Sequence, residues 1–230
     1  MPAPSTTLRV LAASVIASLS VTGCQAVDDA GVALGRADLV NDLAARMDRS
    51  LEQTWAAEYQ LAGGRSASIA QTAKPLQSSY TWPAGKITVT QQAVTRCAST
   101  AARTSCTVSP PVPTAGKPSV IVYAEARKHG LVTPPAVIRL LTDAAFDPAA
   151  EIEQSDTTLA GRHATCVDVT RAGERFTTCV TNEGVLGSFA GTLDGKPAEL
   201  TITGYTDTVR AAAFDVPAGA GVVDRRPATS

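Results

Sequence analysis

The chain has few of the residues on which nucleic-acid and sugar-binding sites depend. Only 4% of its 230 residues are aromatic, so platforms on which bases or sugars could stack are scarce. The 20 Lys and Arg residues are balanced by 21 Asp and Glu residues, and no basic stripe is present. Because nucleic-acid binding needs a clustered positive charge, nucleic acid is excluded as a predicted partner.

Signatures of catalysis and of metal binding are missing as well. The sequence contains neither HExxH nor GxSxG, and the segment GTLDGK (191–196) is one residue too short between its glycines for a phosphate loop. No two cysteines have CxxC spacing. The two histidines are far apart in sequence: His129 lies in a charged turn and His163 at the start of a predicted strand, and both are expected to be solvated. We therefore expect a protein that is not an enzyme and that needs no metal and no cofactor.

No apolar run reaches the roughly 20 residues that span a bilayer, but a shorter one lies near the start. The run VLAASVIASLSV (10–21) follows Arg9 and precedes the small residues Thr22 and Gly23, which is typical of a signal peptide. Cys24 comes next. The alternative to a special role for Cys24 is a plain secretion signal with a chance cysteine near its end.

The residues Val21-Thr22-Gly23-Cys24 resemble the lipobox of bacterial lipoproteins. This resemblance implies that the peptide is cut before Cys24 and that the cysteine thiol carries a diacylglycerol. Two or three acyl chains make a stable tether, whereas one anchors only marginally. The predicted location is the extracytoplasmic face of the cell membrane, with the membrane itself as partner through lipidated Cys24.

The four remaining cysteines form two close pairs in sequence. Cys97 and Cys106 flank one short segment with a small polar turn, and Cys166 and Cys179 flank another. An even number of cysteines in an exported chain indicates disulfides, and four cysteines allow three connectivities. Because each segment reads as a hairpin, the spacing favours Cys97–Cys106 and Cys166–Cys179.

The rest of the chain divides into a tether, one domain and a tail. We expect a signal peptide over 1–23, a tether over 24–36, an α+β domain over 37–224 and a flexible tail over 225–230. Apolar residues four apart (Leu39, Leu43, Met47 and Leu51) predict an amphipathic helix at the start of the domain. The segment 119–126 (SVIVYAEA) reads as a strand, and Thr133 followed by two prolines predicts a second helix over about 134–146.

Residues 163–205 predict an antiparallel meander with one apolar face. Pairing Cys166 with Cys179 places Val169 opposite Phe176, the next turn places Val180 opposite Val185, and the Asp194-Gly195 turn sets Phe189 opposite Leu200. A slip of one residue would turn every apolar side chain outward, so the agreement of three turns specifies the register. The predicted fold is therefore an α+β fold with a curved antiparallel sheet, whose apolar face the N-terminal and mid-chain helices are available to cover.

This order of elements resembles the LolA/LppX/LprG-like lipoproteins. The resemblance implies a half-barrel that encloses an apolar cavity for a lipid ligand. In this chain the cavity would lie between the sheet and the second helix, and an ordinary filled core is the other interpretation of the same residues. The alternative function is a non-catalytic module that binds another cell-envelope protein. The candidate pocket residues are Val137, Leu140, Leu141, Val167, Val169, Phe176, Val180, Phe189, Leu200 and Ile202.

Overall fold

A computed structural model describes residues 23–112 and 120–227 of the chain. Its helices are α1 (Gly23–Ser50), α2 (Val120–Lys128) and α3 (Pro134–Ala145), with short 3-10 turns η1 (Ala62–Gly64) and η2 (Ala211–Phe214). Its first six strands are β1 (Trp55–Leu61), β2 (Arg65–Ala73), β3 (Leu76–Trp82), β4 (Gly85–Val89), β5 (Val94–Ser99) and β6 (Thr104–Ser109). The other six are β7 (Glu151–Leu159), β8 (Arg162–Arg171), β9 (Glu174–Thr181), β10 (Leu186–Leu193), β11 (Lys196–Thr206) and β12 (Gly221–Asp224).

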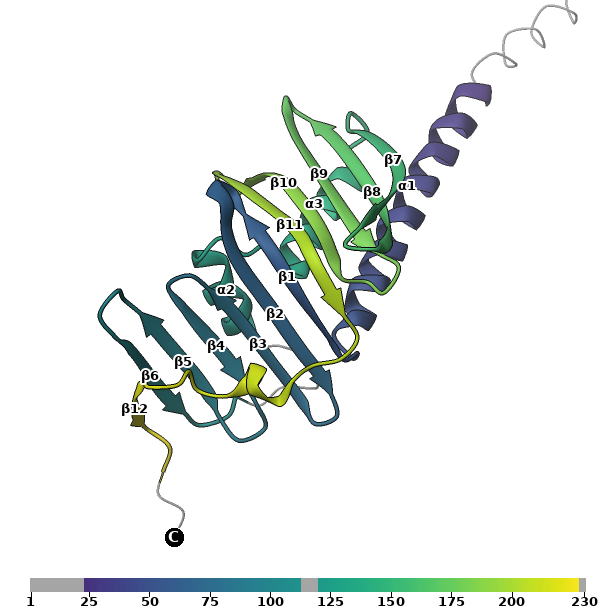
Figure 1. The fold of residues 1–230 in the computed structure, drawn as a ribbon. Coiled ribbons are helices and arrows are strands. Elements are labelled where there is room, and N and C mark those ends of the chain that lie inside the picture. The colour runs from purple at the N-terminus through teal and green to yellow at the C-terminus, as the bar shows by residue number, and fades with distance from the viewer. Residues whose placement is uncertain (1–22, 113–119, 228–230) are drawn as a thin grey trace, which may run out of the picture.

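The strands of the described residues form one open sheet. Their order is β12-β6-β5-β4-β3-β2-β1-β11-β10-β9-β8-β7, so the sheet has two free edges and does not close into a barrel (Figure 1). All neighbouring strands are antiparallel except β12, which runs parallel to β6. The fold is thus a mostly-sheet α+β fold, and the predicted class with an antiparallel sheet is confirmed.

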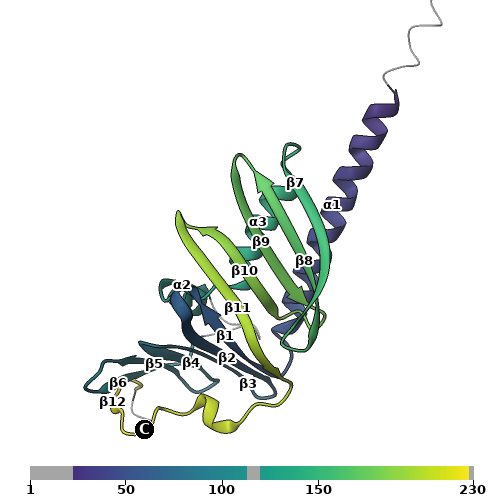
Figure 2. The same ribbon diagram turned by 45° about the horizontal axis from the view of Figure 1, so that its top comes forward.

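Two meanders meet at the centre of this sheet. Strands β1 to β6 form the first, strands β7 to β11 form the second, and β1 pairs with β11 to join them. The register of this pair shifts because Glu58 faces Gly204 whereas Tyr59 faces Ile202, so Thr203 of β11 has no partner and forms a β-bulge. Because a bulge bends a strand and increases its twist, it accounts for a change of direction at the junction of the meanders (Figure 2).

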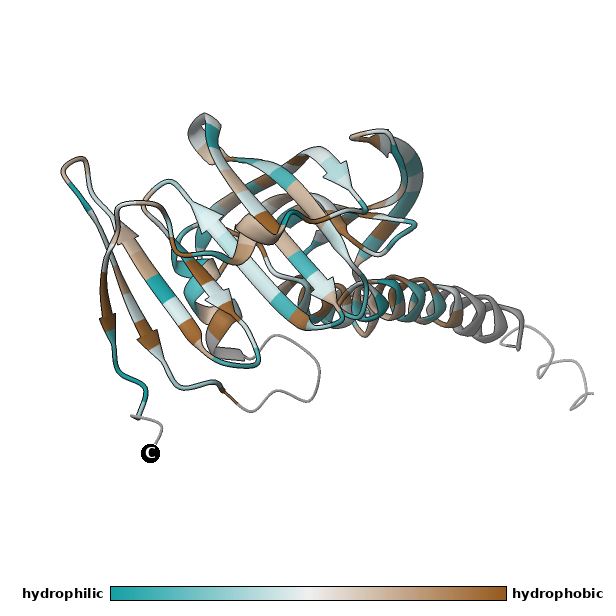
Figure 3. Ribbon diagram, turned by 60° about the horizontal axis from the view of Figure 1, so that its bottom comes forward, coloured by the Kyte–Doolittle hydropathy of each residue, from teal (hydrophilic) through white to brown (hydrophobic). Residues whose placement is uncertain are grey.

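The strands alternate in burial as half-buried strands should. In β1 the side chains of Trp55, Ala57, Tyr59 and Leu61 are buried and their neighbours are more exposed. The same alternation of hydrophobic and hydrophilic residues follows several strands in Figure 3. This period of two places one set of side chains on a single face of the sheet.

Most of the predicted register in the second meander is confirmed. Cys166 pairs with Cys179, Val169 with Phe176, and Phe189 with Leu200. The turn between β9 and β10 differs, because Val180 pairs with Leu186 and not with Val185. A bulge between Leu186 and Ser188 shifts the β9–β10 register further, so that Phe189 faces Thr178 on β9, whereas its pairing with Leu200 on β11 is as predicted.

The predicted apolar stripe of the first helix is buried. Leu43 and Met47 are fully buried, Leu51 follows the helix and is also buried, and Leu39 packs against the same cluster. The helix itself begins at Gly23, fourteen residues before the predicted start, so the segment expected as a tether is helical. Leu34 is largely exposed there. An apolar stripe indicates only the part of a helix that packs against the domain, so the sequence pattern could not predict the helical segment before residue 37.

A close backbone contact holds α1 against the loop between β9 and β10. Gly184 has a φ of +82°, and a Cβ atom at this position would lie 1.9 Å from the carbonyl oxygen of Arg46. The Arg46 guanidinium donates to Thr165 Oγ1 at 3.3 Å and to Asn182 Oδ1 at 3.4 Å, and it pairs with Asp42 at 2.6 Å. Glycine is thus required here both for its backbone conformation and for the space.

The predicted strand over 119–126 is wrong, because Val120–Lys128 forms helix α2. Its β-branched start suggested a strand, since Val and Ile favour strands. Val122, Tyr123 and Ala126 are nevertheless buried together, with the one- and four-residue spacing of a helix face. The second predicted helix is confirmed as α3, which begins after Thr133 with two prolines in its first turn.

The C-terminal segment adds an element that the sequence did not predict. After β11 the chain passes through η2 and returns along the sheet to place β12 beside β6 (Figure 1). Lys86 Nζ donates to the Asp215 carbonyl oxygen at 2.7 Å, and the Arg225 amide donates to the Val108 carbonyl oxygen at 2.8 Å. The expected tail therefore starts with a residue bonded to the sheet, while residues 228–230 lie outside the described chain.

Both predicted disulfides are present. Cys97 is bonded to Cys106 across β5 and β6, and Cys166 to Cys179 across β8 and β9. Disulfides persist in oxidising compartments, which indicates an extracytoplasmic location. Among the helices of residues 23–112 and 120–227, none combines the length and the apolar character that crossing a bilayer requires.

The contact at Gly184 predicts a difference between two glycines with almost the same backbone. Gly173 has a φ of +81°, but a Cβ there would meet nothing within 4 Å. Gly173→Ala should lower the free energy of unfolding by about 1 kcal/mol from backbone strain alone. Gly184→Ala should cost about 2–4 kcal/mol, because it adds the clash with α1. Equal midpoints of the two variants in urea unfolding would contradict the contact.

Candidate functional site

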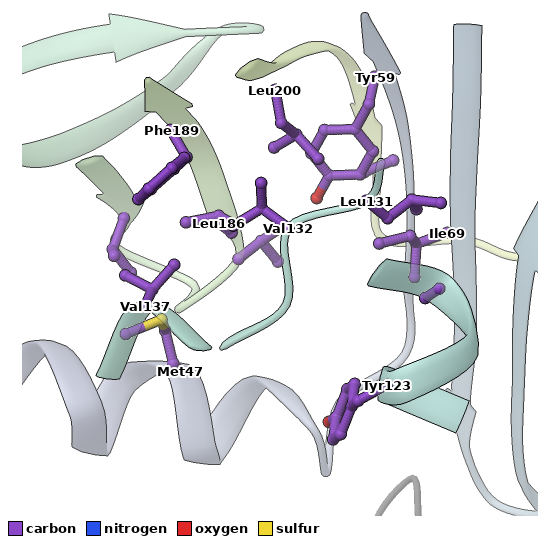
Figure 4. Close-up of a cluster of buried hydrophobic side chains, with 14 of the residues drawn as sticks. Met47, Tyr59, Ile69, Tyr123, Leu131, Val132, Val137, Leu186, Phe189 and Leu200 are labelled. Carbon is purple, nitrogen blue, oxygen red and sulfur yellow. The ribbon is translucent and has the colours of Figure 1, made fainter. Parts of the chain in front are cut away.

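The ten predicted pocket residues come together in the structure. Eight are at most 3% exposed and belong to one hydrophobic cluster: Val137, Leu141, Val167, Val169, Val180, Phe189, Leu200 and Ile202. Leu140 and Phe176 are partly buried and pack against the same cluster. The cluster thus joins α3 to four neighbouring strands, β8 to β11 (Figure 4). A filled core would bury these residues just as a ligand site would, so the pocket itself stays a prediction.

Other members of the cluster were not among the predicted pocket residues. Met47 from α1 and Leu131 and Val132 from the connection between α2 and α3 lie beside the predicted set (Figure 4). The stripe on α1 pointed to Met47 as a buried residue. Leu131 and Val132 are a short apolar pair between a glycine and a helix cap, and such a pair carries no period from which burial could be inferred.

An apolar groove opens on this cluster between α1 and α3. It has a volume of about 270 Å³ and is lined mainly by Met47, Leu51, Pro134, Pro135 and Ile138. Asp48 and Arg139 also line it. Met47 is fully buried and is shared between the groove and the cluster. The groove therefore borders the hydrophobic cluster at Met47.

Three buried tyrosines bring hydroxyl groups to the first meander and α2. Tyr59, Tyr80 and Tyr123 are at most 8% exposed, and the rings of Tyr80 and Tyr123 meet edge-to-face with centroids 6.4 Å apart. Burial raises the pKa of Tyr59 and Tyr80 well above the usual range and the pKa of Tyr123 to about 12. All three phenols are therefore neutral at ordinary pH.

The Tyr123 hydroxyl makes no hydrogen bond of good geometry within the described part of the chain, although the nearby Tyr80 hydroxyl contributes to its pKa. A buried polar group without a partner costs roughly 1–3 kcal/mol, so natural proteins seldom keep one unless something else satisfies it. The side chain of Tyr123 lies in the region between α2 and the end of α1 (Figure 4). The hydroxyl is thus a buried polar group in a mainly apolar interior.

The two histidines have different surroundings. His163 is exposed at the start of β8. His129 was expected to be solvated in a charged turn, but its ring stacks on Trp82 with centroids 4.1 Å apart. Its Nε2 atom also lies 3.5 Å from Glu125. In residues 23–112 and 120–227, no three His, Cys, Asp or Glu side chains gather as metal ligands would.

The polar face of the second meander carries an exposed charge pair. Asp168 accepts hydrogen bonds from Thr177 at 2.5 Å and from Arg175 at 3.1 Å. The hydrogen bond from Thr177 and the one from Arg175 lower the pKa of the Asp168 carboxyl below its usual value. A carboxylate held ionised at the surface between two strands stabilises the sheet and is poorly suited to accept a proton in catalysis.

Part of the predicted lipobox lies outside the described residues. Val21 and Thr22 precede the described chain, while Gly23 and Cys24 are the first two residues of α1. If Cys24 is lipidated, the lipid is attached at the end of the helix that lines the groove. The predicted signal peptide over 1–23 lies outside the described chain except for Gly23.

Comparison with known proteins identifies no family. No family model matches the chain, and no curated protein is similar to it. Among solved structures, an uncharacterised conserved protein from Thermus thermophilus is similar, with 14% identity, a TM-score of 0.45 and coverage of 80% of this chain and 98% of that one. MucB is similar with 12% identity and a TM-score of 0.45 over 78% of this chain and 63% of its own. Similarities at this level carry no argument about function.

The unpartnered hydroxyl predicts an unusual effect of Tyr123→Phe. Removing an unsatisfied buried group should leave the free energy of unfolding unchanged or raise it by up to about 1 kcal/mol. Ser50→Ala is the control, because Ser50 Oγ is buried and donates to the Met47 carbonyl oxygen at 2.7 Å. That variant should lose about 1 kcal/mol. A clear loss of stability on Tyr123→Phe in urea unfolding would show that the hydroxyl is bonded after all.

Proposed function

We propose that this protein is a membrane-anchored exported lipoprotein that binds a lipid or another hydrophobic ligand between its sheet and its helices. The groove between α1 and α3 is the observation that carries the proposal. Its walls are mainly apolar, and one of them, Met47, is also part of the buried cluster. An apolar chain that enters the groove would thus meet mainly apolar surface and reach the buried cluster at Met47.

The volume of the groove suits one segment of a ligand. At about 270 Å³ it is slightly smaller than the roughly 300–1,000 Å³ of typical small-molecule sites. We infer that one end of an acyl chain lies in the groove. The rest of the chain would pass between α3 and the sheet, and the helices would move away from the apolar face of the sheet to admit it. Its methylene groups would then contribute about 0.8 kcal/mol each on leaving water.

The proposed anchor would hold this groove near a membrane. In the proposal, Cys24 carries the lipid at the N-terminus of α1, and the groove lies at the other end of the same helix. At 1.5 Å per residue, the 23 residues from Cys24 to Met47 span roughly 35 Å. The domain would therefore act a short distance from the bilayer, on its extracytoplasmic face, where it could exchange a hydrophobic ligand with the membrane.

A second candidate function is the binding of another cell-envelope protein. It is favoured by strand β12, whose four residues are all exposed and include Val222 and Val223. An exposed strand at the edge of a sheet can pair with a strand of a partner. A protein that carries no ligand but retains a partner through this edge would fit the second function and not the first.

One set of preparations tests both the membrane anchor and the binding of a lipid. The full chain and its Cys24→Ser variant are expressed in a lipid-rich bacterial host and fractionated. We expect the full chain in the membrane fraction and Cys24→Ser in the soluble extracytoplasmic fraction. The Cys24→Ser protein is then purified without detergent, extracted with organic solvent and analysed by mass spectrometry. A defined lipid at about one mole per mole of protein is expected.

Variants of α3 show whether the lipid enters the protein through the groove. Ile138→Trp should fill the groove and lower the amount of extracted lipid at least severalfold. Asp143→Trp is the matched control, because it places the same indole at an exposed position of the same helix and should leave the lipid content unchanged. A stable, lipid-free protein in all three preparations would contradict the proposed function.

A further inference from the structure

A second cleft lies at the far side of the cluster, where α2 ends. It has a volume of about 480 Å³, within the range of small-molecule sites. Three separate segments form it: the start of β2, the end of α2 with the residues after it, and the hairpin between β10 and β11. It shares no lining residue with the groove between α1 and α3.

The floor of this cleft is apolar and continuous with the interior. Leu131 and Val132 line the cleft and are at most 2% exposed within the hydrophobic cluster. Leu193 and Ala198 line it from the β10–β11 hairpin and pack against the same cluster. A ligand in the cleft would therefore lie with one part on residues of the hydrophobic cluster to which the candidate pocket residues also belong.

Four cationic side chains line the same cleft: Arg65, Arg127, Lys128 and Lys196. Two of them already have local partners, because Arg127 pairs with Asp194 at 2.8 Å and Lys128 with Glu125 at 3.2 Å. Both also stand in the last turn of α2, where basic residues are common because they interact favourably with the helix dipole. These two cations alone would not indicate a ligand.

Arg65 and Lys196 are different, since neither lies on that helix. Neither makes an ion pair with any residue that the structure describes. Arg65 donates through Nε to the Ala62 carbonyl oxygen at 3.1 Å, and a Cβ on Gly130 would lie 3.2 Å from its terminal nitrogen. The guanidinium is thus held over the rim of the cleft, with donors left to bind an anion.

We propose that this cleft binds the anionic headgroup of an amphiphile, a phosphate or a carboxylate, between Arg65 and Lys196. The apolar part of the amphiphile would lie on Leu131, Val132 and Leu193. Asp194 and Glu199 also line the cleft, so its excess of positive charge is modest and suits a headgroup of one or two charges. The inference rests on the proposed function, because it names the class of hydrophobic ligand that the protein takes.

The test compares a charged and an uncharged amphiphile that have the same alkyl chain. Binding of dodecyl phosphate, dodecyl glucoside and inorganic phosphate to the Cys24→Ser protein, freed of bound lipid, is measured by calorimetry below micelle concentrations. Dodecyl phosphate should bind about tenfold more tightly than dodecyl glucoside, since a hydrogen bond to a charged group is worth about that factor. Inorganic phosphate should bind much more weakly than either, because it has no chain to bury.

A double variant shows whether the two cations are responsible. Arg65→Gln with Lys196→Gln should remove the tenfold preference for dodecyl phosphate and leave the affinity for dodecyl glucoside unchanged. Lys74→Gln with Arg103→Gln is the control, because it removes the same charge from exposed turns at other places and should keep the preference. The thermal midpoints of both double variants show that each is folded.

The remaining outcomes separate this inference from the proposed function. If the charged and uncharged amphiphiles bind equally well, and the double variant binds them as well as the parent does, the headgroup site is overturned. The proposed binding of a hydrophobic ligand would still stand. Binding of inorganic phosphate as tight as that of dodecyl phosphate overturns the amphiphile and indicates a free anion as ligand. Failure of all three probes to bind overturns the inference, while the organic extract still decides the proposed function on its own.

Discussion

The pairing of β1 with β11 is the constraint on which the rest of the structure depends. These strands come from opposite ends of the domain, and their hydrogen bonds turn two separate meanders into one sheet. The bulge at Thr203 of β11 lies in this pair and bends the sheet where the meanders meet. Without this junction, the apolar residues of the two meanders would not share one cluster with the helices.

Helix α1 is then fixed against the second meander by contacts that have little freedom. Gly184 allows its loop to approach the backbone of Arg46, and the Arg46 side chain bonds Thr165 and Asn182. Leu43 and Met47 are buried below. The groove beside Met47 exists because α1 and α3 are held near each other at this end, and so the position of one glycine bears directly on the candidate site.

Local patterns predicted the parts of the fold that local interactions determine. The hairpins of β8 to β11 followed from turn residues and two-residue alternation, and the cross-strand pairs Cys97–Cys106 and Cys166–Cys179 followed from the hairpins. The register around Val185 was missed because a bulge has no signal in alternation. Helix α2 was misread because its β-branched start favours a strand, whereas the buried face it contributes to the cluster needs a helix.

The remaining gaps concern contacts between distant segments. Strand β12 is short and pairs with β6 more than 110 residues earlier, so no local pattern could predict it. The candidate pocket residues of α3 and the second meander were found from their periodicity. Met47, Leu131 and Val132 were not assigned to it, and neither cleft was foreseen, because cavities arise where elements meet. The proposed interest of Tyr123, Arg65 and Lys196 likewise depends on which elements meet around them, which the sequence does not show.

The central claim is that a hydrophobic ligand lies between the sheet and the helices, and a photoreactive fatty acid tests it most directly. The acid carries a diazirine near the end of its chain and is bound to the Cys24→Ser protein, irradiated and mapped by proteolysis and mass spectrometry. The account predicts adducts on residues of the buried cluster, such as Met47, Val137 and Phe189. Adducts confined to the polar face around Asp168 and Arg175, or to β12, would contradict it.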